Sequence, residues 1–387
     1  MKKYFIIIAI LLDFVNLNSQ NLITNGGFEN FSSCPSSVAQ VNRAVPWYDP
    51  NNSSSDYYHA CANSLGIGIG VPCQGLSCQY YQYPHSGLGY VALELFYHPG
   101  YNYREYIQQQ LLNPLLPNKC YYVEYYTNHT NRSEYAINNI GAYISTTAVV
   151  SPYQLPYNLT PQILLPGNPV ISDTINWTKV YGVYQATGGE DYLTIGNFQN
   201  DSNTTLQIID STLPPDAYYY IDDVSISEIP SGNAGNDTTI CTNDTAQLGV
   251  NNYEGVGYEW QPTMGLSNAA IGNPTATPTH TTTYILTQTT PCSITTDTVT
   301  VTVCLDVGLN QLGIINEELG IYPNPSSGEF SIATKYKVLS VKIKNIIGEE
   351  IKIINSTAFD LTDVSKGIYF AEIKTNKGIV NRKIIKE

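Results

Sequence analysis

The sequence is poor in charged residues. Asp, Glu, Lys and Arg make up 13% of its 387 residues, about half of the roughly 25% that is usual in soluble domains. Basic residues are the rarest, with five in residues 20–334 against 25 acidic ones. Because binding to phosphates needs clustered Lys and Arg, this imbalance argues against a nucleic-acid partner. Apolar residues make up 42% of the chain, which is too many for a disordered protein.

Long apolar runs and familiar catalytic motifs are also missing. After Leu12 no apolar run approaches the roughly 18 residues that a membrane-spanning helix needs. The chain has no Gly-x-Ser-x-Gly, His-Glu-x-x-His or phosphate-loop motif, so the enzyme classes that rely on these motifs are excluded. The histidines show no fixed spacing to carboxylates. We therefore expect a protein that is not an enzyme. The alternative is a hydrolase whose active site is assembled from distant loops.

The first 19 residues are typical of a secretory signal peptide. Lys2 and Lys3 precede an apolar run over residues 4–12, and cleavage is expected near Ser19. A buried N-terminal strand is the alternative for the same run. Export predicts an oxidising compartment, in which cysteines form disulfides.

Residues 20–230 are expected to form the first of three β modules. In residues 120–128, Val123 and Tyr125 share one face and Glu124 and Asn128 share the other, an alternation typical of a half-buried strand. About eight strands with turns between them predict a two-sheet sandwich of jelly-roll type. The expected strands are Asn21–Glu29, Gly89–Phe96, Arg104–Leu112, Cys120–Asn128, Asn139–Ser145, Thr174–Gln185, Tyr192–Phe198 and Tyr218–Ile229.

Both ends of this module carry recognisable strings. The module opens with Asn21-Leu-Ile-Thr-Asn-Gly-Gly-Phe-Glu29 and closes with Tyr218-Tyr-Tyr-Ile-Asp-Asp-Val-Ser-Ile226. These strings resemble the first and last strands of galactose-binding-like jelly rolls, a family that includes many carbohydrate-binding modules. The resemblance implies a jelly-roll fold and a glycan as the ligand class.

The same resemblance suggests a calcium site. In such jelly rolls the first and last strands lie close together, and a hard cation commonly sits there. Glu29, Asp222 and Asp223 would supply carboxylate oxygens for a structural Ca²⁺. The alternative is that these carboxylates are solvated or capped by backbone amides.

Aromatic residues in the loops are the candidate ligand-binding groups, because flat rings stack on sugar faces while polar side chains bind the hydroxyls. Trp47 is the best single candidate, since it follows Pro46 and precedes the Asn- and Ser-rich stretch 48–55. Arg104 is expected to supply polar contacts, whereas Trp177 lies in a strand pattern and is expected in the core. The alternative is that these tyrosines simply pack in a Tyr-rich domain. The other predicted rings are Tyr48, Tyr57 and Tyr58, with Tyr80, Tyr81, Tyr83, Tyr97, Tyr101 and Tyr103 on the same rim.

The second module covers residues 233–305. Short strands rich in Thr and Val, with Trp260 on a central strand, suit an immunoglobulin-like sandwich. The strings Ala234–Cys241 and Tyr258–Pro262 resemble the PKD-like modules of Bacteroidetes surface proteins. That resemblance implies a spacer role and a disulfide between Cys241 and Cys292.

The other cysteines allow several arrangements. Cys73 and Cys78 flank four residues that include Gly75, which suits a small loop closed by a disulfide, and Cys34 with Cys61 is the next predicted pair. Five cysteines precede Asp223 and three follow it. These odd counts leave either a free thiol in each region or one bridge between the modules. A zinc site is the less favoured alternative, because the spacing of its candidate ligands fits no standard zinc finger. Those candidates are His59, Cys61, Cys73, Cys78 and His85.

Residues 306–318 read as a linker, after which the charge changes sign. Residues 335–387 hold 11 basic and six acidic residues, which marks a separate module. The strings Ile321-Tyr-Pro-Asn-Pro325 and Gly367-Ile-Tyr369 resemble the type A C-terminal sorting domain of the Bacteroidetes type IX secretion system. The resemblance covers residues 319–387 and implies a small β-sandwich that is handled by that machinery.

Together these features predict an all-β chain of three sandwich modules. We expect an exported, non-catalytic binding protein, secreted or anchored at the outer-membrane surface, whose ligand is a glycan or another surface polymer. The alternatives are a secreted hydrolase and a structural adhesin that binds protein.

Overall fold

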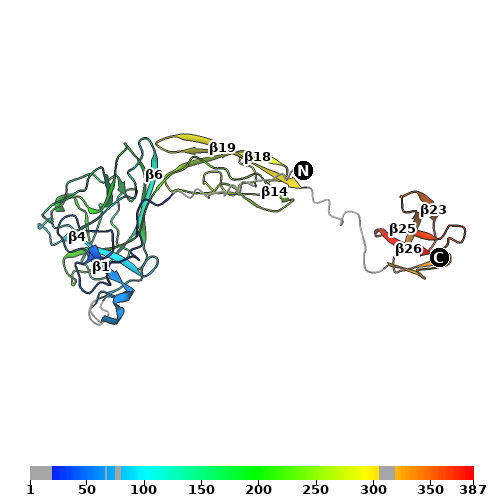
Figure 1. Cartoon of the computed structure of the whole chain (residues 1–387), viewed down its shortest axis with the longest axis horizontal. Coiled ribbons are helices and arrows are strands. Elements are labelled where there is room, and N and C mark those ends of the chain that lie inside the picture. The colour runs from blue at the N-terminus through cyan, green and yellow to red at the C-terminus, as the bar shows by residue number, and fades with distance from the viewer. Residues whose placement is uncertain (1–19, 66–67, 75–79, 305–318) are drawn as a thin grey trace, which may run out of the picture. The chain divides into compact units, whose positions relative to one another are not determined.

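The computed structural model describes residues 20–65, 68–74, 80–304 and 319–387 (Figure 1). The predicted signal peptide and the linker 306–318 lie outside the described residues. The all-β prediction is confirmed, because the described helices are three short 3₁₀ turns. In this part of the chain no helix is long and apolar enough to cross a membrane. The three turns are η1 (Val41–Arg43), η2 (Ala60–Leu65) and η3 (Asp201–Asn203).

Two antiparallel sheets build the N-terminal sandwich. A five-stranded sheet runs in the order β1-β4-β13-β6-β10 and a four-stranded sheet in the order β5-β11-β8-β9. The first sheet comprises β1 (Asp56–His59), β4 (Gly89–Tyr97), β13 (Asp216–Glu228), β6 (Cys120–His129) and β10 (Thr178–Gln185). The second comprises β5 (Tyr106–Gln110), β11 (Tyr192–Asn197), β8 (Ile140–Ser145) and β9 (Ile163–Leu164).

The main core lies between these two sheets. The alternation in β6 directs Val123 and Tyr125 into this core, as the sequence predicted, because successive side chains of a strand point to opposite faces. The expected strand over residues 21–29 does not form, and bends and turns occupy this segment instead. Backbone hydrogen bonds from Leu22 N to Ile226 O and from Val224 N to Gly26 O still hold it beside β13. Smaller strand pairs join β7 (Tyr135–Ile137) to β12 (Leu206–Ile208) and β2 (Cys73–Gln74) to β3 (Tyr80–Tyr81).

A second core covers the outer face of β1, β4 and β13 in the five-stranded sheet. Ala62, Ile69 and Val71 pack there against tyrosines of β1, β4 and β13. The tyrosine hydroxyls find partners inside this layer; for example, Tyr90 Oη donates to Gln82 O at 3.1 Å. Tyrosine suits this position because its ring packs like an apolar group and its hydroxyl can be satisfied locally. The tyrosines in this layer are Tyr58, Tyr90, Tyr218 and Tyr220.

The following strands form an immunoglobulin-like set. Trp260 is fully buried on β16 (Gly257–Gln261), and its Nε1 donates to Ile271 O at 2.9 Å. The prediction that it lies on a central strand is wrong, because β16 is at the edge of its sheet. A four-stranded sheet runs in the order β14-β19-β18-β16, and β15 pairs with β17. Their bounds are β14 (Thr238–Cys241), β15 (Ala246–Gln247), β16 (Gly257–Gln261), β17 (Thr275–Ala276), β18 (Thr282–Thr289) and β19 (Ile294–Cys304).

Residues 319–387 fold as a small sandwich of their own, with sheets β20-β21-β24 and β23-β22-β25-β26 around one core. In β22 the side chains alternate, since Val341 and Ile343 are buried while Lys342 and Lys344 pair with Glu350 and Glu372. The strands are β20 (Leu319–Tyr322), β21 (Glu329–Thr334), β22 (Val338–Lys344), β23 (Glu350–Ile354), β24 (Ala358–Asp360), β25 (Gly367–Thr375) and β26 (Gly378–Lys386).

The disulfides differ in part from the prediction. Cys34–Cys61 forms as predicted. The Cys241–Cys292 prediction is wrong, because β14 and β19 are neighbours and bring Cys241 within 4.7 Å of Cys304, measured between Cα atoms. Cys292 follows β18 and bonds to Cys120 at the start of β6, which is the bridge between modules that the odd counts allowed. In the predicted Cys73–Cys78 pair, Cys78 lies outside the described residues.

Peptide mapping under non-reducing conditions tests this connectivity. We expect one linked peptide pair containing Cys120 and Cys292 and another containing Cys241 and Cys304. Replacing Cys120 and Cys292 by Ser should lower the free energy of unfolding by about 2–5 kcal/mol, because that bridge closes a long loop. A linked pair of peptides containing Cys241 and Cys292 would overturn this assignment.

The prediction of an exposed Trp47 is also wrong. The side chain is 1% exposed, its ring centroid lies 5.3 Å from that of Phe28, and Nε1 donates to Asn25 O at 2.9 Å. The loop that carries Trp47 turns inward, so its ring closes one end of the main core rather than facing a ligand.

Trp47→Ala should therefore destabilise the N-terminal sandwich by about 3–5 kcal/mol, the usual cost of removing a buried aromatic ring. Urea denaturation of the purified chain measures this difference. Tyr83→Ala is the matched control, because Tyr83 is 60% exposed and its removal should change stability by less than about 0.5 kcal/mol. Equal stability of the Trp47→Ala variant and the parent chain would contradict the core position.

Candidate ligand-binding groove

A hollow of about 360 Å³ opens beside the loop that leads into β1. This volume falls within the range of small-molecule sites. Most of its lining side chains are polar, which sets it apart from the apolar cores on both faces of the central sheet. Ala39, Val41, Asn42, Tyr48, Asp49, Asn52, Ser53 and Ser55 line it, and we call it the 39–55 groove.

Tyr48 is fixed in this groove by the edge of β5. Its backbone exchanges two hydrogen bonds with Gln108, at 3.0 and 2.9 Å, and its hydroxyl accepts from Gln108 Nε2 at 2.5 Å. Burial raises the pKa of Tyr48, so the hydroxyl stays neutral at physiological pH. The ring therefore reaches the groove already ordered, which lowers the entropy that binding must remove.

The polar groups beside Tyr48 come from one short loop. Asp49 is half-buried and accepts from Asn51 N at 2.9 Å. Burial raises the pKa of Asp49, while hydrogen bonds from Asn51 and Ser53 lower it in part. Asn42 and Asn52 are exposed, and an amide can both donate to and accept from a ligand hydroxyl. The groove can thus bind a polar, hydroxyl-bearing ligand.

Arg104 is not available to a ligand, contrary to the prediction. Its side chain is fully buried, donates to Gln199 O at 3.1 Å and to Tyr103 O at 2.7 Å, and pairs with Asp201 at 2.9 Å. Burial lowers the pKa of Arg104, and the charge of Asp201 raises it in part. The guanidinium therefore links the loop before β5 to the loop that carries Gln199 and Asp201.

Tyr57 and Tyr58 are also core residues rather than ligand contacts. Tyr57 is fully buried and donates from its hydroxyl to Phe28 O at 2.7 Å. Tyr58 is 5% exposed and packs in the second core. Of the five predicted ligand-binding residues, Tyr48 is the one that lines the groove. The Asn and Ser residues of the groove could have been predicted, because the stretch 48–55 is rich in Asn and Ser.

The three predicted calcium ligands gather around residues 85–89. Glu29 Oε1 accepts from Leu88 N at 2.7 Å, and Asp222 Oδ2 accepts from His85 N at 2.8 Å. Asp223 accepts from the Ser86 hydroxyl and lies 2.6 Å from His85 Nδ1. Burial, followed by the charge of Asp223, raises the pKa of Asp222 to about 8.

These contacts match the alternative of capped carboxylates. Throughout the described ranges, no three His, Cys, Asp or Glu side chains are grouped so that they could hold a metal ion. Calcium at Glu29, Asp222 and Asp223 stays a prediction. The zinc alternative loses two ligands, because Cys61 is bonded to Cys34 and Cys73 is also in a disulfide.

Trp177 is more exposed than expected. It is half-buried, and its Nε1 donates to Tyr83 O at 3.1 Å. The neighbouring Tyr81 and Tyr83 are 48% and 60% exposed and stand edge to face, with centroids 5.4 Å apart. These three residues form a rim of rings separate from the groove lining. The strand pattern misled the prediction because Trp177 precedes β10 rather than lying within it.

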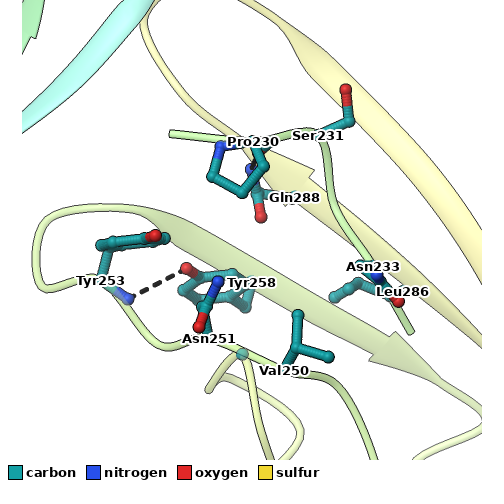
Figure 2. A pocket seen from close by; sticks show the side chains of 10 residues that line it. Pro230, Ser231, Asn233, Val250, Asn251, Tyr253, Tyr258, Leu286 and Gln288 are labelled. Carbon is teal, nitrogen blue, oxygen red and sulfur yellow. Dashed lines mark hydrogen bonds between the residues drawn. The ribbon is translucent and has the colours of Figure 1, made fainter. Parts of the chain in front are cut away.

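A smaller hollow lies between Pro230 and Tyr258 (Figure 2). The Tyr253 backbone N–H donates to Tyr258 Oη at 3.0 Å on its wall. Its volume of about 10 Å³ leaves room for about one water molecule. It is therefore a packing defect rather than a ligand site.

Comparisons with known proteins assign the C-terminal part of the chain. Residues 320–387 match the secretion system C-terminal sorting domain. No curated protein sequence is significantly similar to this chain.

Several solved structures are similar to the chain at low sequence identity. An adhesin domain of Lys-gingipain from Porphyromonas gingivalis is 16% identical, over 53% of this chain and 96% of that one, with a TM-score of 0.26. The adhesin domain of Epf from Streptococcus pyogenes is 10% identical, over 74% and 98%, with a TM-score of 0.27. A CBM4 structure is 13% identical, over 54% and 99%, with a TM-score of 0.25. These values are too low to assign a ligand.

The sequence strings, the separate sandwich and the family match agree on the C-terminal part. Residues 320–387 are a type IX secretion sorting domain, and the chain that carries it is a secreted or cell-surface protein.

Proposed function

We propose that the protein is a non-catalytic glycan-binding protein, exported through its C-terminal sorting domain, and that the 39–55 groove holds the ligand. The observation that carries this proposal is the composition of the groove. It offers one ordered tyrosine ring among amides, hydroxyls and a single carboxylate. Sugars need this combination, because one face of the pyranose ring is apolar while its rim carries hydroxyls.

The groove favours binding over hydrolysis. Glycoside hydrolysis commonly uses two carboxyl groups on either side of the scissile bond. Asp49 is the single carboxylate among the lining residues of the groove. A ligand held there would meet hydrogen-bonding groups but no acid and base pair.

A glycan array probed with the purified chain identifies the ligand, and two substitutions test the site. Tyr48→Ala removes the ring, and Asn42→Ala removes an exposed amide that the fold does not need. Each should weaken binding of the best glycan about tenfold or more, since each lost contact is worth about 1–2 kcal/mol. Titration calorimetry measures the affinity, and thermal denaturation of each variant confirms folding.

Tyr83→Ala is the matched control, because Tyr83 is an exposed ring outside the groove lining. It should bind the glycan as the parent chain does. Loss of binding in Tyr83→Ala with full binding in Tyr48→Ala would move the site to the Tyr81–Tyr83 rim. Capture of protein but of no glycan would favour the adhesin alternative instead.

A further inference from the structure

A β-bulge in β4 brings acidic and aromatic side chains together at one end of the five-stranded sheet. Glu94 pairs with Tyr218 and Phe96 with Ala217, so Leu95 is an extra residue on β4. Leu95 and Phe96 both point into the main core. Tyr97, which pairs with Asp216, therefore returns to the outer face beside Glu94. β-Bulges commonly redirect side chains in this way near functional sites.

Four carboxyl groups share this end of the sheet with one cation. They belong to Glu94, Glu105, Asp56 and Asp216, and the cation is Arg132. Glu105 accepts from Ser54 N and from the Tyr103 hydroxyl with one oxygen, and from Glu94 N with the other. Asp56 accepts from Ala39 N and from the Tyr218 hydroxyl. The Arg132 guanidinium lies 3.4 Å from Asp216 Oδ2, with its central carbon 4.1 Å from the Tyr218 ring centroid.

The single positive charge of Arg132 does not neutralise four carboxyl groups. Asp216 is 3% exposed, and its Oδ1 has no hydrogen-bond partner, although the Ser133 hydroxyl lies near the carboxylate and lowers its pKa in part. Burial, Glu105, Asp216 and Asp56 raise the pKa of Glu94 to about 8, and Arg132 lowers it in part. Glu94 is half-buried, so an added positive charge could reach this carboxyl group from solvent.

Aromatic rings stand next to the acids. Tyr97 is 42% exposed, and its ring centroid lies 5.8 Å from those of Tyr101 and Tyr103. Rings beside carboxylates are the surroundings that organic cations prefer, because the ring faces and the carboxylates both attract positive charge. A metal ion fits less well, since the described residues include no group of three ligands arranged to hold one.

We propose that Glu94, Asp216 and Tyr97 form a second binding site of the N-terminal sandwich, which takes the ammonium group of a cationic ligand. The site does not depend on the 39–55 groove, because none of its three residues lines that groove. Its ligand would be recognised by charge, whereas the groove offers mainly neutral polar groups.

Choline is a suitable probe, because its quaternary ammonium keeps its charge at every pH, and 3,3-dimethylbutan-1-ol is its neutral counterpart of the same shape. We expect the purified full chain to bind choline and not the neutral alcohol in titration calorimetry. Between pH 7 and pH 9 the affinity should rise about tenfold, because Glu94 ionises with a pKa near 8 and the charged carboxylate attracts the ammonium.

Glu94→Gln keeps the shape of the side chain and removes its charge. It should remove most of this rise with pH, leaving the part due to Glu105, whose pKa burial raises to about 7, and weaken choline binding at pH 9 about tenfold. Asp210→Asn is the matched control, because Asp210 is an exposed acid outside this cluster, and it should change neither. Tyr97→Ala should weaken binding at both pH values, and thermal denaturation checks that every variant is folded.

Three results would overturn the proposal. The first is equal binding of choline and the neutral alcohol, which would show that charge is not recognised. The second is a folded Glu94→Gln variant with unchanged choline affinity at pH 9. The third is no heat of binding for the parent chain up to about 50 mM choline, an affinity too weak for a specific site.

Discussion

Burial of β1, β4 and β13 on both faces, over most of their length, is the constraint on which the rest of the N-terminal sandwich depends. The inner face packs against the second sheet, and the outer face packs under Ala62, Ile69 and Val71. A strand covered on both faces cannot present its side chains to a ligand. Ligand sites are therefore left to the loops and to the ends of the sheet, where the 39–55 groove and the acidic cluster lie.

Tyrosine makes this double burial possible. In the second core Tyr218 and Tyr58 bring their hydroxyls within 3.3 Å of each other, and Tyr220 Oη lies 3.0 Å from the Thr130 hydroxyl. An unpartnered buried hydroxyl would cost about 1–3 kcal/mol, so the layer is stable because its tyrosines bind one another and nearby polar groups. The aromatic residues of this layer therefore serve packing rather than recognition.

The two proposed sites lie on either side of one short segment. Ser53 and Ser55 line the groove. Ser54 instead donates to Glu105, and Asp56 accepts from the Tyr218 hydroxyl of the acidic cluster. Side chains of an extended chain alternate in this way. Adjacent residues of this strand-like segment thus line the groove on one side and bond to the acidic cluster on the other.

Patterns that are local in the sequence were predicted well, and those that depend on distant contacts were not. Alternation identified β6, and ordered strings identified the sorting domain. Trp47 was expected at the surface and is buried, while Trp177 was expected in the core and is half-buried at its edge, because sequence alone does not show whether a loop turns inward. The pairing of Cys241 with Cys304 depends on which strands are neighbours, which the spacing of cysteines does not reveal.

A crystal structure of the chain with the best glycan from the array tests the central claim most directly. We predict density for a sugar ring in the 39–55 groove, against Tyr48 and within hydrogen-bond distance of Asn42 or Asp49. A glycan bound at the Tyr81–Tyr83 rim, with the groove unchanged, would contradict the proposal that the groove is the glycan site.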